Sequence, residues 1–193
     1  KIDKSSAQIG LLGGQHGLFG GNISAQTIKN GLGIRINADY SKSEGYIPNT
    51  QYDKYSAGLL ISKVYNKGSI DLSSGIFSNH FGASNFYHPK FSRQYEEVSS
   101  GLFSLNWNHN FSNKISGSFI GSYRIHHDMY DFDKYRDTTL KSFLNFHQTK
   151  VADFEYKLRY LAKNSKSAVG WAYRNEDVLS NRLGELISDK VKV

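Results

Sequence analysis

The sequence predicts an all-β protein, an antiparallel meander of about nine long strands that is part of a transmembrane β-barrel. Apolar and polar residues alternate with a period of two in segment after segment, as in strands with one apolar face. Tight polar turns also alternate with long aromatic-rich connections, which is typical of barrels with short periplasmic turns and long outer loops. The turns are Lys29-Asn30-Gly31, Asn66-Lys67-Gly68, Ser112-Asn113-Lys114 and Asn164-Ser165-Lys166, and the long connections lie around 45–53, 82–95 and 128–148.

The alternation marks individual strands along the chain. In order, the apolar sets are Ile34, Ile36, Ala38 and Tyr40; Ile70, Leu72 and Ile76; Phe103, Leu105 and Trp107; Ile115, Phe119, Tyr123 and Ile125; and Phe154, Tyr156, Leu158, Tyr160 and Ala162. Apolar outliers fall on the polar side at Leu60, Ile120 and Leu161. The expected strands are 6–14, 19–28, 32–44, 53–66, 69–81, 95–111, 114–128, 149–163 and 167–179.

Strand length separates the two folds that such alternation allows. The expected strands are about as long as the ~9–11 tilted residues that cross a bilayer, or longer, whereas soluble strands usually end after about 5–6 residues. A soluble antiparallel sandwich is the alternative. Tyrosines near strand ends suit an aromatic girdle at a membrane interface and favour the barrel. They are Tyr40, Tyr55, Tyr65, Tyr123, Tyr160 and Tyr173.

Composition constrains the partners. The 193 residues contain no cysteine, which removes disulfides and thiolate metal sites, and no apolar run approaches the ~20 residues of a spanning helix. The formal charge of +7 is carried by scattered lysines and arginines with no basic cluster, so we expect no nucleic-acid partner. Scattered cations suit a polar barrel interior or the phosphates of lipopolysaccharide.

Both ends of the chain are expected to lie inside a longer protein. The sequence starts at Lys1 in mid-pattern and ends at Val193 in a polar stretch. Nine strands cannot close a bacterial single-chain barrel, which uses an even number. We therefore expect residues 1–193 to form one partial barrel domain.

Five groups of residues resemble TonB-dependent outer-membrane receptors, most closely the cobalamin-receptor-like branch, over about residues 5–186. In that family the resembling segments belong to the part of the barrel just after its plug domain. They are Gly13-Gly14-Gln15-His16-Gly17-Leu18-Phe19-Gly20; Gly45-Tyr46-Ile47-Pro48-Asn49-Thr50; Phe81-Gly82-Ala83-Ser84-Asn85-Phe86-Tyr87 with Gln94-Tyr95-Glu96; Arg124-Ile125-His126-His127-Asp128; and Asn175-Glu176-Asp177-Val178-Leu179-Ser180 with Leu183-Gly184-Glu185.

The resemblance implies a location in the cell outer membrane and a transport function. Such receptors are barrels of roughly 22 strands, plugged by an N-terminal domain, that import bulky metal chelates such as cobalamin or a siderophore with energy relayed by TonB. It implies as partners the TonB complex, reached through the missing plug, the chelate, and outer-membrane lipid and lipopolysaccharide; a surface lipoprotein is left open. The loop from Gly45 to Asp53 has a single acid, so no calcium site is carried over.

The expected ligand-binding residues lie in the long connections and on one strand. Large aromatic surfaces in exposed loops commonly anchor ligands, although here they could equally pack loop on loop or on a plug. His126 and Asp128 share a strand face with Arg124, while His127 points the other way, so His126 and His127 cannot hold one metal ion. We expect no metal site and no cofactor. The candidates are Tyr46, Asn85, Tyr87, Tyr95, Arg124, His126 and Asp128.

No catalytic residue is expected. The chain has no G-x-S-x-G nucleophile elbow, and its 18 glycines form no phosphate-binding loop. Two other functions stay open. One is an outer-membrane adhesin or structural barrel, and the other is a hydrolase at the barrel rim that would combine His126 and Asp128 with a serine.

Overall fold

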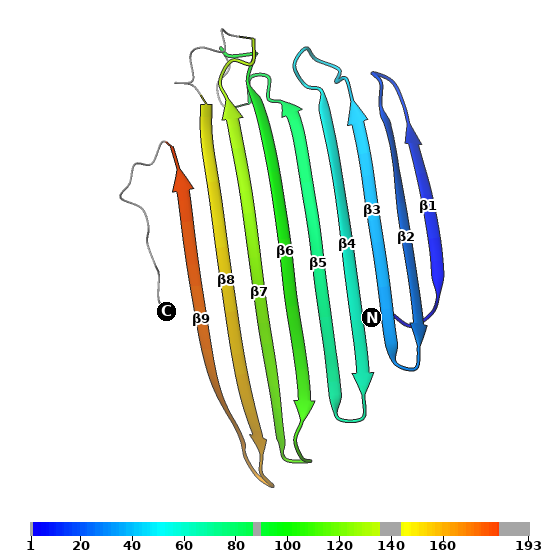
Figure 1. The fold of residues 1–193 in the computed structure, drawn as a ribbon, viewed down its shortest axis with the longest axis vertical. Coiled ribbons are helices and arrows are strands. Elements are labelled where there is room, and N and C mark those ends of the chain that lie inside the picture. Colours follow the sequence, from blue (N-terminus) through cyan, green and yellow to red (C-terminus); the bar gives the residue numbers. More distant parts are fainter. Residues whose placement is uncertain (1, 87–89, 136–143, 182–193) are drawn as a thin grey trace.

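A computed structural model describes residues 2–86, 90–135 and 144–181. These residues form nine antiparallel strands in a single sheet in which every strand pairs with its neighbours in sequence (Figure 1). No helix in these ranges is long and apolar enough to cross a membrane. The strands are β1 (Ser6–Gly13), β2 (Phe19–Lys29), β3 (Leu32–Ser43), β4 (Tyr52–Tyr65), β5 (Gly68–Gly82), β6 (Tyr95–Asn110), β7 (Ile115–Asp131), β8 (Leu144–Leu161) and β9 (Lys166–Ser180).

All nine expected strands are confirmed, and one connection was predicted too long. β7 continues to Asp131 and β8 begins at Leu144, so the connection expected over 128–148 spans only 132–143. The two strands keep pairing through Asp128 opposite His147 and through Asp131 opposite Leu144. Leu144 and Phe146 alternate with Asn145 and His147 in this extension, so the strand signal was present but was assigned to the aromatic-rich connection.

Short turns close one edge of the sheet, and longer loops close the other (Figure 1). Asn30 and Gly31 form a two-residue turn with φ of 52° and 73°, the positive values that a type I′ hairpin requires. In the turn between β6 and β7, the hydroxyl of Ser112 accepts hydrogen bonds from the backbone N–H groups of Lys114 and Ile115 at 3.2 and 3.1 Å. We call the end of the sheet where short turns join the strands the turn edge, and the end where longer loops join them the loop edge.

The pairing register sorts side chains into two unlike faces. A row across the apolar face, read from β3 to β8, contains Ile34, Ile61, Leu72, Leu105, Gly121 and Phe154. The next row, on the polar face and read from β3 to β9, contains Arg35, Leu60, Ser73, Ser104, Ser122, Asp153 and Arg174. All six tyrosines assigned to a girdle share the apolar face, and the outliers Leu60, Ile120 and Leu161 lie on the polar face, as predicted.

Within the described ranges, no second layer of protein covers the apolar face. Among the described residues, only Ile2, Ala83 and Val151 are buried hydrophobic residues. Leu11, Trp171 and Val169, in contrast, are 86, 62 and 67% exposed. A sandwich would cover such a face with another sheet, so the described part of the chain forms a single-layered wall.

The apolar band runs diagonally across the strands. On β2 it extends from Phe19 to Ala25, and on β9 from Tyr173 down to Val169. Across the paired strands, Ala25 lies in the same row as Asn175 of β9, which is six residues closer to the loop edge than Val169. Phe19 lies in the same row as Phe146 of β8, whose neighbour Asn181 is eight residues closer to the loop edge than Tyr173. Figure 1 shows the matching stagger, in which each successive turn lies further down.

This drift measures how far the strands tilt against the band. A drop of six to eight residues at ~3.3 Å each, over seven strand spacings of ~4.8 Å, corresponds to a tilt of roughly 30–40°. Strands of outer-membrane barrels tilt by about 35–45°.

Candidate ligand-binding loop edge

Three loops at the loop edge are tied to one another, beginning with β1–β2 and β3–β4. The backbone N–H of Glu44 donates to the carbonyl oxygen of His16 at 2.8 Å, and the hydroxyl of Ser43 donates to the same oxygen at 3.0 Å. The ring of Tyr46 meets the ring of His16 edge to face, with centroids 5.3 Å apart. These contacts fix the first two loops as one unit.

Asn49 joins the β3–β4 loop to the β5–β6 loop. Its side-chain amide donates to the backbone oxygens of Ser92 at 2.8 Å and Gln94 at 2.6 Å, and its own backbone oxygen accepts from Ser84 N at 3.1 Å. Its φ of 61° lies in the left-handed region that asparagine tolerates. A β-carbon on Gly82 would lie 2.5 Å from the Asn49 oxygen, so this close approach requires glycine.

The β5–β6 loop is tied in turn to the segment that follows β7. The backbone N–H of Lys134 donates to the Arg93 carbonyl at 3.0 Å, and the Arg93 guanidinium lies 3.9 Å from the Asp133 carboxylate. Phe91 and Phe132 also pack with ring centroids 4.2 Å apart. The contacts thus form a continuous chain from the β1–β2 loop to Lys134.

The candidates predicted in the long connections differ in how accessible they are. Tyr46 is 82% exposed, and Asn85 is exposed with a φ of 58° and a backbone N–H that donates to Phe91 O at 3.0 Å. Tyr87 lies outside the described residues. Phe86 is 72% exposed at the same edge, as expected of an aromatic residue in a long loop, and Tyr135, which was not singled out from the sequence, is 64% exposed.

Tyr95 is less exposed than expected, although the expected strand 95–111 correctly placed it at the start of a strand. It is the first residue of β6, above the apolar band, and it is only partly exposed. The ammonium group of Lys134 lies 4.1 Å from the centre of its ring. Burial, together with the nearby Glu97 carboxylate, raises the pKa of Tyr95 to about 12.

The three candidates on β7 share the polar face, as the alternation predicts. Arg124, His126 and Asp128 are successive residues of that face, and the His127 side chain lies on the opposite face, where it contacts Gln148 Nε2 at 3.3 Å. The hydroxyl of Ser100 lies 2.7 Å from His126 Nδ1. Asp128 Oδ1 is buried and has no hydrogen-bond partner within the described chain.

The described residues contain no group of three or more histidine, aspartate or glutamate side chains placed to hold a metal ion. Adjacent strand residues diverge, and the pair His126 and His127 is separated by the sheet for this reason.

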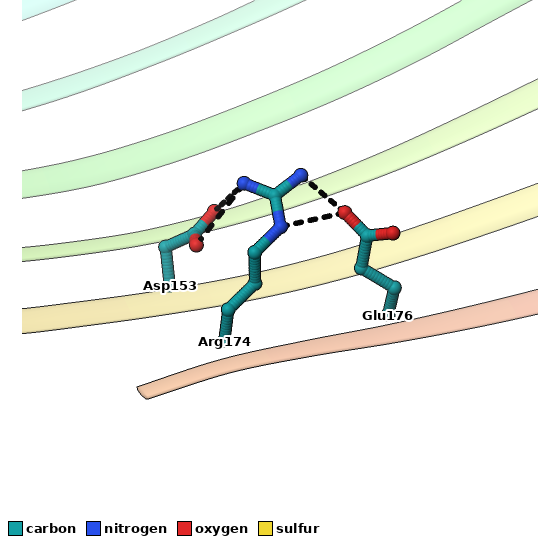
Figure 2. Close-up of polar contacts among 3 residues, drawn as sticks. All are labelled: Asp153, Arg174 and Glu176. Atoms are coloured by element: carbon teal, nitrogen blue, oxygen red, sulfur yellow. Dashed lines mark hydrogen bonds and ion pairs between the residues drawn. The ribbon is translucent and has the colours of Figure 1, made fainter. Parts of the chain in front are cut away.

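An ion-pair cluster on the polar face was not predicted. Figure 2 shows the guanidinium of Arg174 between the carboxylates of Asp153 and Glu176. Arg174 Nη1 lies 3.3 Å from Asp153 Oδ1, and Arg174 Nε donates to Glu176 Oε1 at 2.6 Å. The three side chains are exposed to solvent, which screens both pairs, so the cluster adds little to stability. Its sequence signal is weak, because Asp153 and Arg174 become neighbours only through the β8–β9 register.

These features define an open antiparallel wall with an apolar band, a polar face and a connected set of loops at one edge. No known protein family model matches the chain, and no curated protein is significantly similar to it.

Proposed function

We propose that this chain is barrel wall and outer loops of a TonB-dependent outer-membrane importer of a bulky metal chelate such as cobalamin or a siderophore, and that the segment itself is not an enzyme. The observation that carries the membrane part is the diagonal apolar band. Its drift gives the strand tilt of an outer-membrane barrel, and tyrosines occupy the apolar face near its margins. Trp107 lies on the turn side of the same face, where its Nε1 donates to Tyr65 Oη at 3.0 Å.

The loop edge supports the capture of a large ligand. Its loops are held to one another by backbone and aromatic contacts, which lowers the entropy that binding would cost. Tyr46, Phe86 and Tyr135 present rigid apolar surface, and Arg124, His126 and Asp128 add hydrogen-bonding groups on the polar face of β7. A bulky chelate with an apolar body and polar substituents suits this combination.

The polar face supports a plug as the neighbouring domain. Ile2 is 4% exposed, and a β-carbon on Gly33 would lie 3.1 Å from its side chain, so the segment before β1 crosses the polar face. A plug joined there would lie on the polar side of the wall and would carry the contact to the TonB complex. The apolar side would contact outer-membrane lipid and lipopolysaccharide.

Uptake by cells tests this function. Cells that express the intact reading frame would be given radiolabelled cyanocobalamin or a ferric siderophore, with and without a working TonB system. We expect accumulation of at least one chelate that requires both the receptor and TonB. Surface-located receptor without TonB-dependent accumulation of any chelate would contradict import and would favour an adhesin or structural barrel.

One contact favours a second candidate, a hydrolase. The 2.7 Å approach of Ser100 Oγ to His126 Nδ1 is a nucleophile–base pair, and Asp128 is the next residue on the same face. No hydrogen bond joins Asp128 to His126 within the described chain, so the orienting group is not engaged. Turnover of an ester or phospholipid that is abolished by His126→Ala would support the enzyme over the importer.

A further inference from the structure

Two open hollows lie next to each other on the apolar face. The upper hollow, of about 780 Å³, lies nearer the loop edge and is bordered by Tyr55, His80, Glu97, His127 and Gln148. The lower hollow, of about 580 Å³, lies within the apolar band and is bordered by Ile36, Leu59, Ile76, Phe103 and Tyr123. Both volumes fall in the range of ligand sites.

Small side chains form the floors of both hollows. Ser78 and Ser99 face each other across β5 and β6 in the upper hollow, and Ala57 and Gly101 lie on either side of Ile76 in the lower one. Ser99 and Gly101 are successive positions of the same face of β6, as are Tyr55 and Ala57 on β4. The two hollows therefore form one groove that runs along the strands from polar to apolar surroundings.

The polar half of the groove carries hydrogen-bonding groups with little net charge. Gln148 Nε2 contacts His127 at 3.3 Å, and the hydroxyl of Ser78 contacts His80 Nε2 at 3.3 Å. The one carboxylate among its side chains on this face, that of Glu97, would repel a phosphate but accepts hydrogen bonds from sugar hydroxyls. Tyr55 and Phe146, 46 and 48% exposed, add aromatic surface on which a sugar ring packs.

We propose that this groove binds a glycolipid, with its sugar headgroup in the upper hollow and an acyl chain in the lower hollow. The inference rests on the membrane-facing wall of the proposed function and is independent of which chelate the receptor carries. The order of the hollows matches a lipid in a bilayer, since the polar half lies above the band and the apolar half lies within it.

The test uses the full receptor purified in a detergent without sugar groups and native mass spectrometry. The probes are diglucosyl diacylglycerol and phosphatidylglycerol with the same acyl chains, with maltose as a free sugar. We expect the glycolipid to bind roughly tenfold more tightly than phosphatidylglycerol, and maltose to bind negligibly. Equal affinity for the two lipids, or equally tight binding of maltose, would overturn the proposal.

Two variants and two matched controls locate the site. A β-carbon at position 101 would lie an ordinary 3.5 Å from Ile125, so Gly101→Leu fills the lower hollow without a backbone clash, and Gln148→Ala removes a donor from the upper hollow. Each should abolish the preference for glycolipid. Gly170→Leu, on the polar face of β9, and Gln8→Ala, on the polar face of β1, border neither hollow and should leave it intact. If Gly101→Leu and Gln148→Ala both keep the preference for glycolipid, the groove is not the binding site and the proposal is wrong. If the receptor shows no chelate uptake but keeps the glycolipid preference, only the proposed import function is contradicted.

Discussion

The side-chain amide of Asn49 donates a 2.6 Å hydrogen bond to the backbone oxygen of Gln94, 45 residues further along the chain. This bond and its partner to Ser92 connect the tip of the β3–β4 loop to the residues that lead into β6. The loop edge therefore has a structural centre at a residue that presents no large surface to a ligand.

Asn49→Ala should loosen the loop edge and leave the sheet intact. The change leaves two backbone oxygens without their donor, at about 1–3 kcal/mol, and places alanine at an unfavourable positive φ. Asn49→Gly keeps the backbone conformation and removes only the side-chain bonds. We expect faster hydrogen exchange across 83–86 and 90–94 in both variants, with a larger effect for alanine. Wild-type exchange rates in both would show that Asn49 does not hold the loops together.

Gly82→Ala should disturb the same junction by overpacking. The added methyl group would overlap the Asn49 backbone oxygen, and relief requires a shift of the loop backbone at a cost of about 1–3 kcal/mol. Gly75→Ala is the matched control, since its β-carbon would lie 3.6 Å from the nearest atom, the Ala57 oxygen. Denaturant midpoints of the intact protein in micelles should fall for Gly82→Ala and hold for Gly75→Ala. Equal midpoints would contradict the close approach.

Charge on the two faces of β6 should have unequal costs. Leu105 lies within the apolar band and Asn106 lies on the polar face. Leu105→Arg should destabilise the folded protein in bilayers by about 2–4 kcal/mol, whereas Asn106→Arg should destabilise it much less. Equilibrium unfolding in lipid vesicles measures both. A similar loss in the two variants would argue against a lipid-facing side.

His126 and Tyr95 should matter for uptake to different degrees. His126→Ala removes an imidazole from the polar face and should lower chelate uptake several-fold at unchanged surface level. Tyr95→Ala should also lower uptake, although its partly covered ring under Lys134 indicates an indirect role in loop placement. His109→Ala, near the turn edge, is the matched histidine control. If the His126→Ala variant takes up as much chelate as the His109→Ala control, His126 does not contribute to ligand binding.

The sheet was predictable from sequence because period-two alternation is a local signal. The same alternation of odd and even positions correctly placed Arg124, His126 and Asp128 on one face of β7 and His127 on the other. The role of Asn49 was not predictable, because its partners are 43 and 45 residues away and their proximity depends on the loop conformation. The ion-pair cluster around Arg174 was not predicted for a similar reason, because Asp153 becomes its neighbour only through the register of β8 and β9.

The most direct test of the membrane-facing wall is a nitroxide scan of β6 in the intact receptor in a bilayer. These 193 residues contain no cysteine, so none of them competes with single cysteines placed at positions 102 to 107 for the label. We expect labels at 103, 105 and 107 to collide mainly with oxygen dissolved in lipid, and labels at 102, 104 and 106 to be shielded from it. Six positions equally accessible to a water-soluble nickel chelate would show that neither face contacts lipid and would contradict the account.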